Sequence, residues 1–198
     1  MNLANKLTIF RIILVPIMIV VTFLEWPGEF LGIPTVAWLL NVIFIIASIT
    51  DKLDGYVARS RNQITTFGKF LDPIADKVLV ITAMIILVEM GRLPSWIPTI
   101  IVFREFIVSG YRLIAVENGG KVIAASIWGK LKTVTQMIAI IVAFIDNYAF
   151  GTIVRGELSG FPMLINAITT IMMVLCVITT IFSGWDYIKN GKELLKDK

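Results

Sequence analysis

Long apolar stretches separated by short polar turns dominate this chain. Each stretch approaches or exceeds the roughly 20 helical residues that are needed to cross a bilayer. Glycine and proline mark the turns between them, as at Pro27-Gly28 and Gly119-Gly120. The pattern predicts an all-α membrane protein with six transmembrane helices and a short amphipathic segment at residues 1–6. The predicted helices are Leu7–Leu24, Val36–Arg59, Gly68–Met90, Trp96–Val116, Ala125–Phe150 and Phe161–Ile188.

Composition narrows the class of protein. A length of 198 residues suits one domain, and a hydrophobic content of 57% is not that of a soluble domain. We therefore expect a single integral-membrane domain over residues 1–198, with the lipid bilayer as a partner and no nucleic acid. The chain has no histidine, which excludes Ser-His and Cys-His nucleophilic chemistry. Carboxylates remain as the main candidates for a general base near neutral pH.

Basic residues gather on one side of the predicted six-helix arrangement. The other side has only Arg92 and Arg155, beside several acidic residues. The positive-inside rule predicts a multi-pass protein of the cell membrane with both termini and its aspartate cluster at the cytoplasmic face. The basic residues assigned to that face are Lys6, Arg11, Arg59, Arg61, Lys69, Lys121, Lys130, Lys132, Lys189, Lys192, Lys196 and Lys198.

Four aspartates, Asp51, Asp54, Asp72 and Asp76, stand at the ends of the predicted second and third helices. Their spacings of three and four residues put each pair on one helix face. An acidic residue at the centre of a membrane helix costs about 2.5–3.5 kcal/mol on insertion scales, so four converging carboxylates need water or cations.

One or two divalent metal ions, bound by hard oxygen ligands, satisfy this need. Magnesium or manganese is favoured because the ligands are carboxylates only, and we expect two ions. The alternative is that the aspartates form ion pairs at solvated helix ends, with Lys52, Lys69, Lys77 and Arg59.

The aspartate stretch resembles the signature of the CDP-alcohol phosphotransferase family, Asp-x2-Asp-Gly-x2-Ala-Arg-x8-Gly-x3-Asp-x3-Asp. The resemblance implies a six-helix membrane enzyme, usually a homodimer, that displaces CMP from a CDP-linked lipid or alcohol with a second alcohol. It also implies that all four aspartates bind metal and that Asp76 accepts the proton of the attacking hydroxyl. Every fixed position of the signature is matched, by Asp51, Asp54, Gly55, Ala58, Arg59, Gly68, Asp72 and Asp76.

The other residues of the signature suit a nucleotide substrate. Gly55, Ala58 and Gly68 are small and let a bulky nucleotide approach the backbone closely. Arg59 can offer forked donors to phosphate. We expect these four residues to bind CDP-diacylglycerol.

Three further stretches, at residues 5–11, 104–112 and 129–133, place charges or hydroxyls in apolar surroundings. Together they resemble phosphatidylglycerophosphate synthases, whose acceptor is sn-glycerol 3-phosphate. A dianionic acceptor needs a cationic pocket. The candidates for this pocket are Arg112, Lys130 and Lys132, with Thr8 and Arg11 at its lip.

These basic residues have other interpretations. Lys130 and Lys132 can be anchors that contact anionic lipid headgroups. Arg104 and Glu105 are adjacent in sequence and are not expected to share one helix face. A buried polar support network through Glu105 and its neighbours on that helix is as well founded as a substrate contact.

The expected function is transfer of the phosphatidyl group from CDP-diacylglycerol to sn-glycerol 3-phosphate, which gives phosphatidylglycerophosphate and CMP. A phosphatidylinositol-phosphate synthase and a cardiolipin-type synthase are the alternatives within the family. A divalent-cation channel or transporter is the alternative from another class, since acidic residues inside membranes also mark cation pathways. The polar residues crowd one side of the predicted bundle instead of threading its depth, which favours the enzyme.

Overall fold

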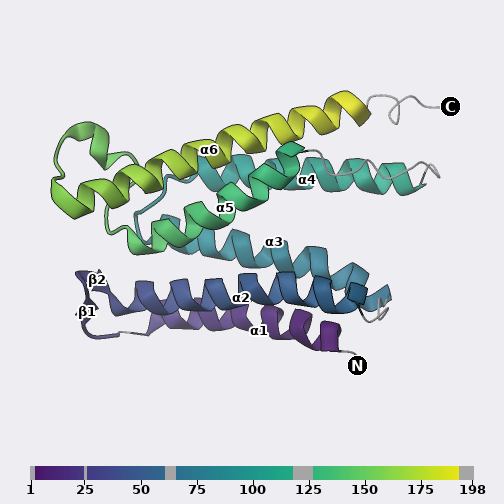
Figure 1. Cartoon of the computed structure of the whole chain (residues 1–198), viewed down its shortest axis with the longest axis horizontal. Coiled ribbons are helices and arrows are strands. Elements are labelled where there is room, and N and C mark those ends of the chain that lie inside the picture. The colour runs from purple at the N-terminus through teal and green to yellow at the C-terminus, as the bar shows by residue number, and fades with distance from the viewer. Residues whose placement is uncertain (1–2, 25, 61–65, 118–126, 192–198) are drawn as a thin grey trace. The chain divides into compact units, whose positions relative to one another are not determined.

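The computed structural model describes residues 3–24, 26–60, 66–117 and 127–191, and the side chains of residues 5–24, 26–51, 68, 70–114 and 127–189. In this part of the chain the structure is mostly helical (Figure 1). Two short strands, β1 (Glu29–Phe30) and β2 (Ile33–Pro34), and a 3₁₀ helix, η1 (Thr152–Arg155), accompany the helices. The helices are α1 (Leu3–Phe23), α2 (Thr35–Ser60), α3 (Thr66–Glu89), α4 (Trp96–Glu117), α5 (Ile127–Ile145) and α6 (Gly160–Gly191).

Each predicted helix has a counterpart, and the differences lie at the ends. Helix α1 begins at Leu3, so the predicted amphipathic segment continues directly into the first helix. Helix α5 ends at Ile145 instead of Phe150. There the Asp146 carboxylate accepts a hydrogen bond from the Tyr148 backbone N–H at 3.0 Å, a local turn that competes with further helix.

Within the residues that the structure describes, three helices are long and apolar enough to cross a membrane, judged by length and composition. These spans are Asn5–Phe23 in α1, Ile127–Ile145 in α5 and Gly160–Lys189 in α6. Within the described part of α2, Thr35–Asp51 is a shorter apolar stretch. The structure therefore supports a helical membrane protein.

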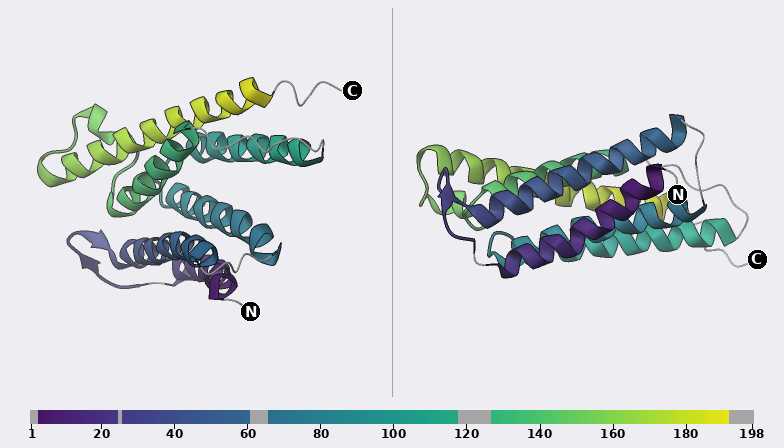
Figure 2. Two further views of the ribbon diagram at one scale, coloured as in Figure 1. Left: turned by 45° about the vertical axis from the view of Figure 1, so that its right-hand side comes forward. Right: turned by 90° about the horizontal axis from the view of Figure 1, so that it is seen from below.

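The chain divides into two compact units. The first unit comprises Met1–Leu93 with Ile141–Ala149, and the second comprises Pro94–Ile140 with Phe150–Lys198. In the first unit α1 packs against both α2 and α3, as Figure 2 shows from two further directions. The core of this unit is apolar, with Met18, Phe44 and Leu79 fully buried. This packing fixes the ends of the three helices relative to one another.

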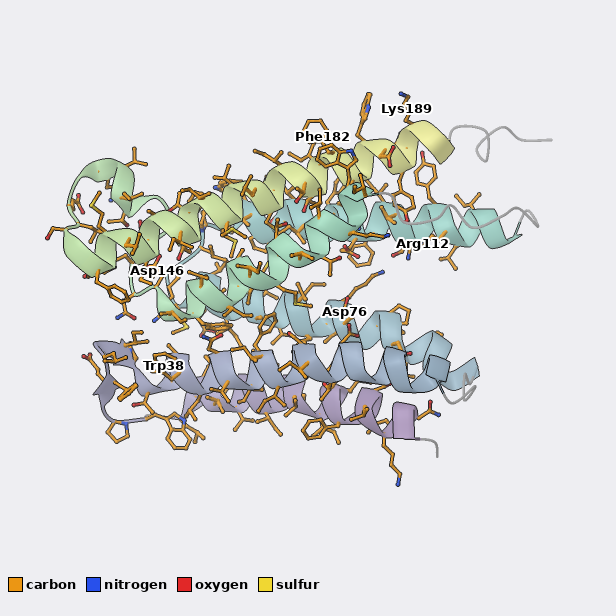
Figure 3. All side chains as sticks on the ribbon, in the orientation of Figure 1. Trp38, Asp76, Arg112, Asp146, Phe182 and Lys189 are labelled. Atoms are coloured by element: carbon orange, nitrogen blue, oxygen red, sulfur yellow. The ribbon has the colours of Figure 1, made fainter. Side chains whose placement is uncertain are left out.

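A β-hairpin leads from α1 to α2. Its two-residue loop, Leu31-Gly32, has positive φ angles of 56° and 73°, as the turns that match the twist of a hairpin require. Trp38 on α2 donates its indole N–H to the Phe30 carbonyl oxygen at 3.0 Å, and the Thr35 hydroxyl donates to the Gly28 carbonyl oxygen at 2.9 Å. The hairpin is thereby attached to the first turns of α2 (Figure 3).

Arg92, in the turn after α3, closes the C-terminal end of α5. Its guanidinium donates to the carbonyl oxygens of Ala143 at 3.2 Å and Phe144 at 2.5 Å, and to Asn147 Oδ1 at 2.9 Å. The last carbonyls of a helix lack partners within the helix, and a cation favours that end of the helix dipole. Burial lowers the pKa of the Arg92 guanidinium, and the charge of Asp146 opposes part of that shift.

In the second unit α4 packs against α6. The segment before α6 is tied to it by two side chains: Asn166 Oδ1 accepts the Ile153 backbone N–H at 2.9 Å, and Thr170 Oγ1 accepts that of Gly151 at 3.2 Å. These bonds satisfy backbone donors at the start of η1. They set the point from which α6 begins.

Candidate active site

Helix α1 has one buried face whose chemistry changes along its length. Met18 and Val15 are buried and apolar, and Arg11, Thr8 and Asn5 continue the same face toward the N-terminus. The exposed fraction is 0% for Arg11 and 1% for Thr8, so these polar groups lie inside the first unit. Buried polar groups need hydrogen-bond partners inside the protein.

Helices α2 and α3 carry the aspartates at the corresponding end. Asp51 continues the buried face of α2 beyond Phe44, and Asp72 and Asp76 precede the buried Leu79 on α3. All three carboxylates are half-buried. Because α2 ends and α3 begins where α1 begins, these aspartates belong to one end of the first unit (Figures 1 and 3).

Two contacts join α1 to the aspartates. Arg11 Nη1 lies 2.9 Å from Asp51 Oδ1, and the Thr8 hydroxyl donates to Asp72 Oδ1 at 2.6 Å. The sequence placed Thr8 and Arg11 at the lip of an acceptor pocket, whereas in the structure they are buried against two of the aspartates. Among the described side chains, the cation that pairs with Asp51 is Arg11 of α1; Lys52, Lys69 and Arg59 lie outside them.

The rest of the signature is only partly described. Asp54, Gly55, Ala58 and Arg59 occupy the C-terminal part of α2, and their side chains lie outside the described residues. Gly68 is buried on α3.

The donor set at this end of the first unit fits a hard cation by its chemistry, since it offers carboxylate oxygens alone. Among the side chains that the structure describes, no three acidic or cysteine groups lie close enough together to hold a metal ion. Asp54, which the signature makes one of the four ligands, lies outside these described side chains.

The second unit has a polar cluster of its own, centred on Glu105. The Glu105 Oε1 atom accepts from Arg104 Nη1 at 2.9 Å and from Lys132 Nζ at 2.5 Å. Arg104 Nη2 donates to Ser183 Oγ at 2.5 Å, so the cluster joins α4, α5 and α6. Arg104 and Glu105 are adjacent and were not expected to share one helix face, but the long arginine side chain still reaches its neighbour.

Tyr187 extends this cluster to Arg112. The Arg112 Nη2 atom donates to the Tyr187 hydroxyl at 2.8 Å, and its guanidinium carbon lies 5.5 Å from the ring centroid. The guanidinium of Arg104 lies 5.7 Å from the same centroid, within the range of cation–π attraction. Tyr187 is buried with an exposed fraction of 2%, while Arg112 itself is exposed.

The predicted acceptor residues of this unit are therefore not equivalent. Lys132 is buried and ion-paired, Arg112 is exposed but held by Tyr187, and Lys130 is exposed on α5. Sequence reasoning missed Ser183 and Tyr187. The available signal was their spacing of four residues, which puts two hydroxyls on one face of an otherwise apolar helix.

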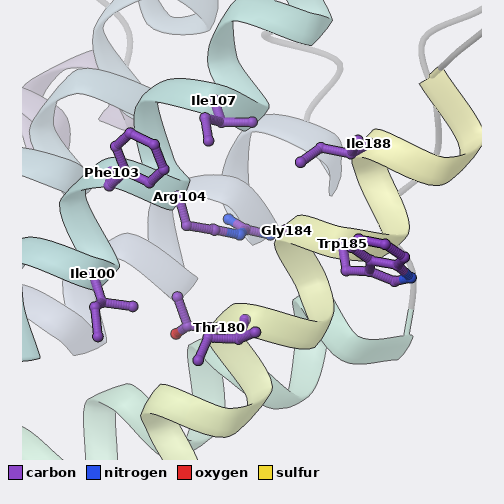
Figure 4. A pocket seen from close by; sticks show the side chains of 9 residues that line it. Ile100, Phe103, Arg104, Ile107, Thr180, Gly184, Trp185 and Ile188 are labelled. Carbon is purple, nitrogen blue, oxygen red and sulfur yellow. The ribbon is translucent and has the colours of Figure 1, made fainter.

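Gly184 allows α4 and α6 to approach at this cluster. A Cβ atom at this position would lie 3.3 Å from Arg104 Cγ, which is tighter than most side-chain contacts. Beside it lies an open cavity of about 250 Å³ (Figure 4). The lining is mostly apolar and includes Ile100, Phe103, Arg104, Ile107, Thr180, Trp185 and Ile188.

Comparison with known proteins gives consistent results. The family model for CDP-alcohol phosphatidyltransferases matches residues 1–182. A Bacillus subtilis protein named CDP-diacylglycerol–glycerol-3-phosphate 3-phosphatidyltransferase is 40% identical, over 98% of this chain and 97% of its own. A Haemophilus influenzae protein of the same name is 38% identical, over 99% of this chain and 96% of its own. A Mycobacterium tuberculosis protein named probable phosphatidylglycerophosphate synthase is 38% identical, over 96% of this chain and 81% of its own.

The cluster around Glu105 generates a prediction about stability. We expect Glu105→Gln to lower the Tm in detergent, because the substitution removes the carboxylate charge with which Arg104 and Lys132 both pair. Removing one partner of a largely buried ion pair costs about 3 kcal/mol. Glu157→Gln is the matched control, since Glu157 is exposed beyond η1, and it should leave Tm unchanged. Equal Tm values for the two variants would show that the cluster does not stabilise the second unit.

Proposed function

Because the chain belongs to the CDP-alcohol phosphatidyltransferase family, we propose that it transfers the phosphatidyl group from CDP-diacylglycerol to sn-glycerol 3-phosphate. The products are phosphatidylglycerophosphate and CMP. The observation that carries this proposal is the identity of 38–40% to relatives with that activity in their names, over nearly the whole chain. The site agrees with it, since the first unit gathers aspartates of the family signature at one end.

We further propose a single membrane domain in which all six helices span the bilayer. Helices α2, α3 and α4 have 26, 24 and 22 residues, which is long enough at 1.5 Å per residue. The aspartates of α2 and α3 fall toward one end of the first unit, where a bilayer surface can hydrate them. The excess of basic residues assigned to that side favours a cytoplasmic site and cytoplasmic termini. A homodimer is the expected assembly from the family resemblance.

Asp51, Asp54, Asp72 and Asp76 are the proposed ligands of two magnesium or manganese ions. Such ions reverse the local negative charge and stabilise charge on a phosphate group. The proposal is supported by the carboxylate-only donor set. It is also supported by the positions of Asp51, Asp72 and Asp76 at one end of the first unit.

The chain's own residues account for the remaining chemistry. Asp76 accepts the proton of the primary hydroxyl of glycerol 3-phosphate, and the hydroxyl oxygen forms a bond to the phosphorus that carries diacylglycerol. The bond from that phosphorus to the CMP oxygen breaks, and CMP leaves. Gly55, Ala58, Arg59 and Gly68 bind the CDP part of the lipid substrate.

Arg112, Lys130 and Lys132 are the proposed residues for the acceptor phosphate. Arg112 is the strongest candidate, because it is exposed and its guanidinium is oriented by Tyr187. Lys130 is also exposed, whereas Lys132 is committed to Glu105 and contributes chiefly through its charge. The burial of Thr8 and Arg11 favours a different role for them.

An acceptor panel tests the proposed function directly. Purified protein with magnesium and CDP-diacylglycerol should release CMP when glycerol 3-phosphate is added, and not without an alcohol. Uncharged glycerol should be a very poor acceptor, because it lacks the phosphate that the cations bind. Faster release with inositol phosphate or phosphatidylglycerol would overturn the choice of acceptor. Absence of CMP release with every alcohol would overturn the enzyme assignment.

Asp76→Asn should abolish turnover while CDP-diacylglycerol still binds in the presence of metal. Loss of a general base costs roughly 10²–10⁴-fold in rate. The measurement is CMP release together with equilibrium binding of the lipid substrate. Glu89→Gln, an exposed position at the other end of α3, is the control and should retain the full rate. A variant rate above about a tenth of the wild type would refute the role of base, and lost binding would make Asp76 chiefly a metal ligand.

Arg112→Ala should raise the KM for glycerol 3-phosphate and leave that for CDP-diacylglycerol little changed. A hydrogen bond to a charged group contributes about 1.5–3 kcal/mol, which corresponds to roughly ten- to a hundredfold. Lys130→Ala and Lys132→Ala should have smaller effects of the same kind, and the exposed Arg155→Ala on η1 should have none. If the lysines are only lipid anchors, their variants will be made in smaller amounts but will show normal saturation kinetics in detergent.

A further inference from the structure

We infer that the buried polar face of α1 is a positioning element for the metal ligands, in which Thr8 orients Asp72 and Arg11 compensates the charge of Asp51. The inference rests on the proposed function, because it concerns the same aspartates. It assigns Thr8 and Arg11 to the support of these carboxylates and not to contact with the acceptor.

The burial of Arg11 is the first argument. Its exposed fraction is 0%, and an arginine cannot escape burial by losing its proton. A buried charge must therefore be paired inside the protein. Asp51 supplies that charge at 2.9 Å, and this carboxylate is itself 34% exposed. A cation with no exposed surface cannot bind a substrate phosphate that arrives from solvent, so Arg11 is not a lip residue.

The hydrogen bond of Thr8 is the second argument. Its hydroxyl is buried and donates to Asp72 Oδ1 at 2.6 Å. In metal sites, carboxylate ligands are held by hydrogen bonds from residues behind them, and loss of such a bond typically costs 10–100-fold in metal affinity. Thr8 is such a residue, because its hydroxyl holds the Asp72 carboxylate from behind.

The spacing of the two residues is the third argument. Thr8 and Arg11 are three positions apart on one face of α1, and they contact aspartates on two different helices. Asp51 belongs to the first half of the signature and Asp72 to the second. Below them the same face is apolar and packed, with Val15 and Met18 buried. Helix α1 thus contacts two proposed ligands, Asp51 on α2 and Asp72 on α3, and sets their positions.

The two contacts have opposite consequences for metal binding. Thr8 carries no charge, so its loss only releases Asp72, and the affinity for metal should fall. Arg11 repels a cation while it neutralises Asp51. Its loss should destabilise the metal-free protein, and an added divalent cation should restore more stability than it does in the wild type. A residue that supports only the packing of α1 would lower stability equally at every metal concentration.

The experiment measures Tm in detergent against magnesium concentration, without substrates. Thr8→Val keeps the shape of the side chain and removes the donor. We expect the magnesium concentration for half-maximal stabilisation to rise roughly ten- to a hundredfold. Thr8→Ser restores the donor and should return the midpoint toward the wild-type value. Thr22→Val is the matched control, because this threonine near the other end of α1 is half-buried and donates to the Ile19 carbonyl oxygen of its own helix; it should leave the midpoint unchanged.

Arg11→Met is the second variant, with a side chain of comparable length and no charge. We expect a lower Tm without metal and a larger gain in Tm on saturation with magnesium. An unchanged magnesium midpoint for Thr8→Val, or an equal loss of Tm for Arg11→Met at all magnesium concentrations, would overturn the inference. If Arg11→Met does not fold, the Thr8 series decides alone.

The outcomes also separate this inference from the proposed function. A raised KM for glycerol 3-phosphate in Thr8→Val, with a normal response of Tm to magnesium, would return Thr8 to the acceptor pocket. If magnesium does not stabilise the wild type at all, the proposed metal site fails and the inference fails with it. If magnesium stabilises the wild type and Thr8→Val alike, only the role of α1 is refuted.

Discussion

The cost of placing charge among apolar helices constrains this structure throughout. The chain is 57% hydrophobic, yet among its described side chains three arginine or lysine residues are buried, Arg11, Arg92 and Lys132. Each of them is matched inside its own unit: Arg11 by Asp51, Lys132 by Glu105, and Arg92 by carbonyl oxygens at the end of α5. Each buried cation among the described side chains is therefore placed where another element supplies its complement.

The two polar clusters differ in their balance of charge. At the end of the first unit the described carboxylates of α2 and α3, Asp51, Asp72 and Asp76, are half-buried, and Arg11 pairs with Asp51. In the second unit Glu105 is shared by two cations, and a further cation, Arg112, reaches the surface beside Tyr187. The first arrangement suits cations and the second suits anions. A transferase whose substrates carry phosphates and whose ligands are carboxylates needs both kinds of cluster.

The sequence predicted the helices well because each is a long apolar run bounded by glycine, proline or charge. It also predicted the family, since the eight fixed residues of one signature are all present between Asp51 and Asp76. The end of α5 was predicted less well, because its outcome depends on a single side-chain bond by Asp146. The β-hairpin was not predicted, since its loop contains Leu31 in a conformation that leucine seldom adopts.

Contacts between distant residues could not be predicted from periodicity. The pairing of Arg11 with Asp51, and of Arg112 with Tyr187, depends on which helices lie side by side, and the apolar pattern of a membrane helix carries little of that information. The sequence pattern also does not show whether a polar residue faces solvent or a neighbouring helix. Thr8 illustrates the point, because a threonine near a helix end has the same local sequence whether it faces solvent or a carboxylate.

The burial of Arg11 has a consequence for how the protein enters the membrane. Helix α1 is made first, and it carries a cation on the face that its neighbours later cover. The partner, Asp51, lies near the end of α2, so the charge has no carboxylate until the second helix has been synthesised. Until then the arginine must remain at the aqueous boundary, where its side chain can reach water. The first two helices are therefore expected to settle in the bilayer as a pair, with the ion pair forming as the hairpin between them closes.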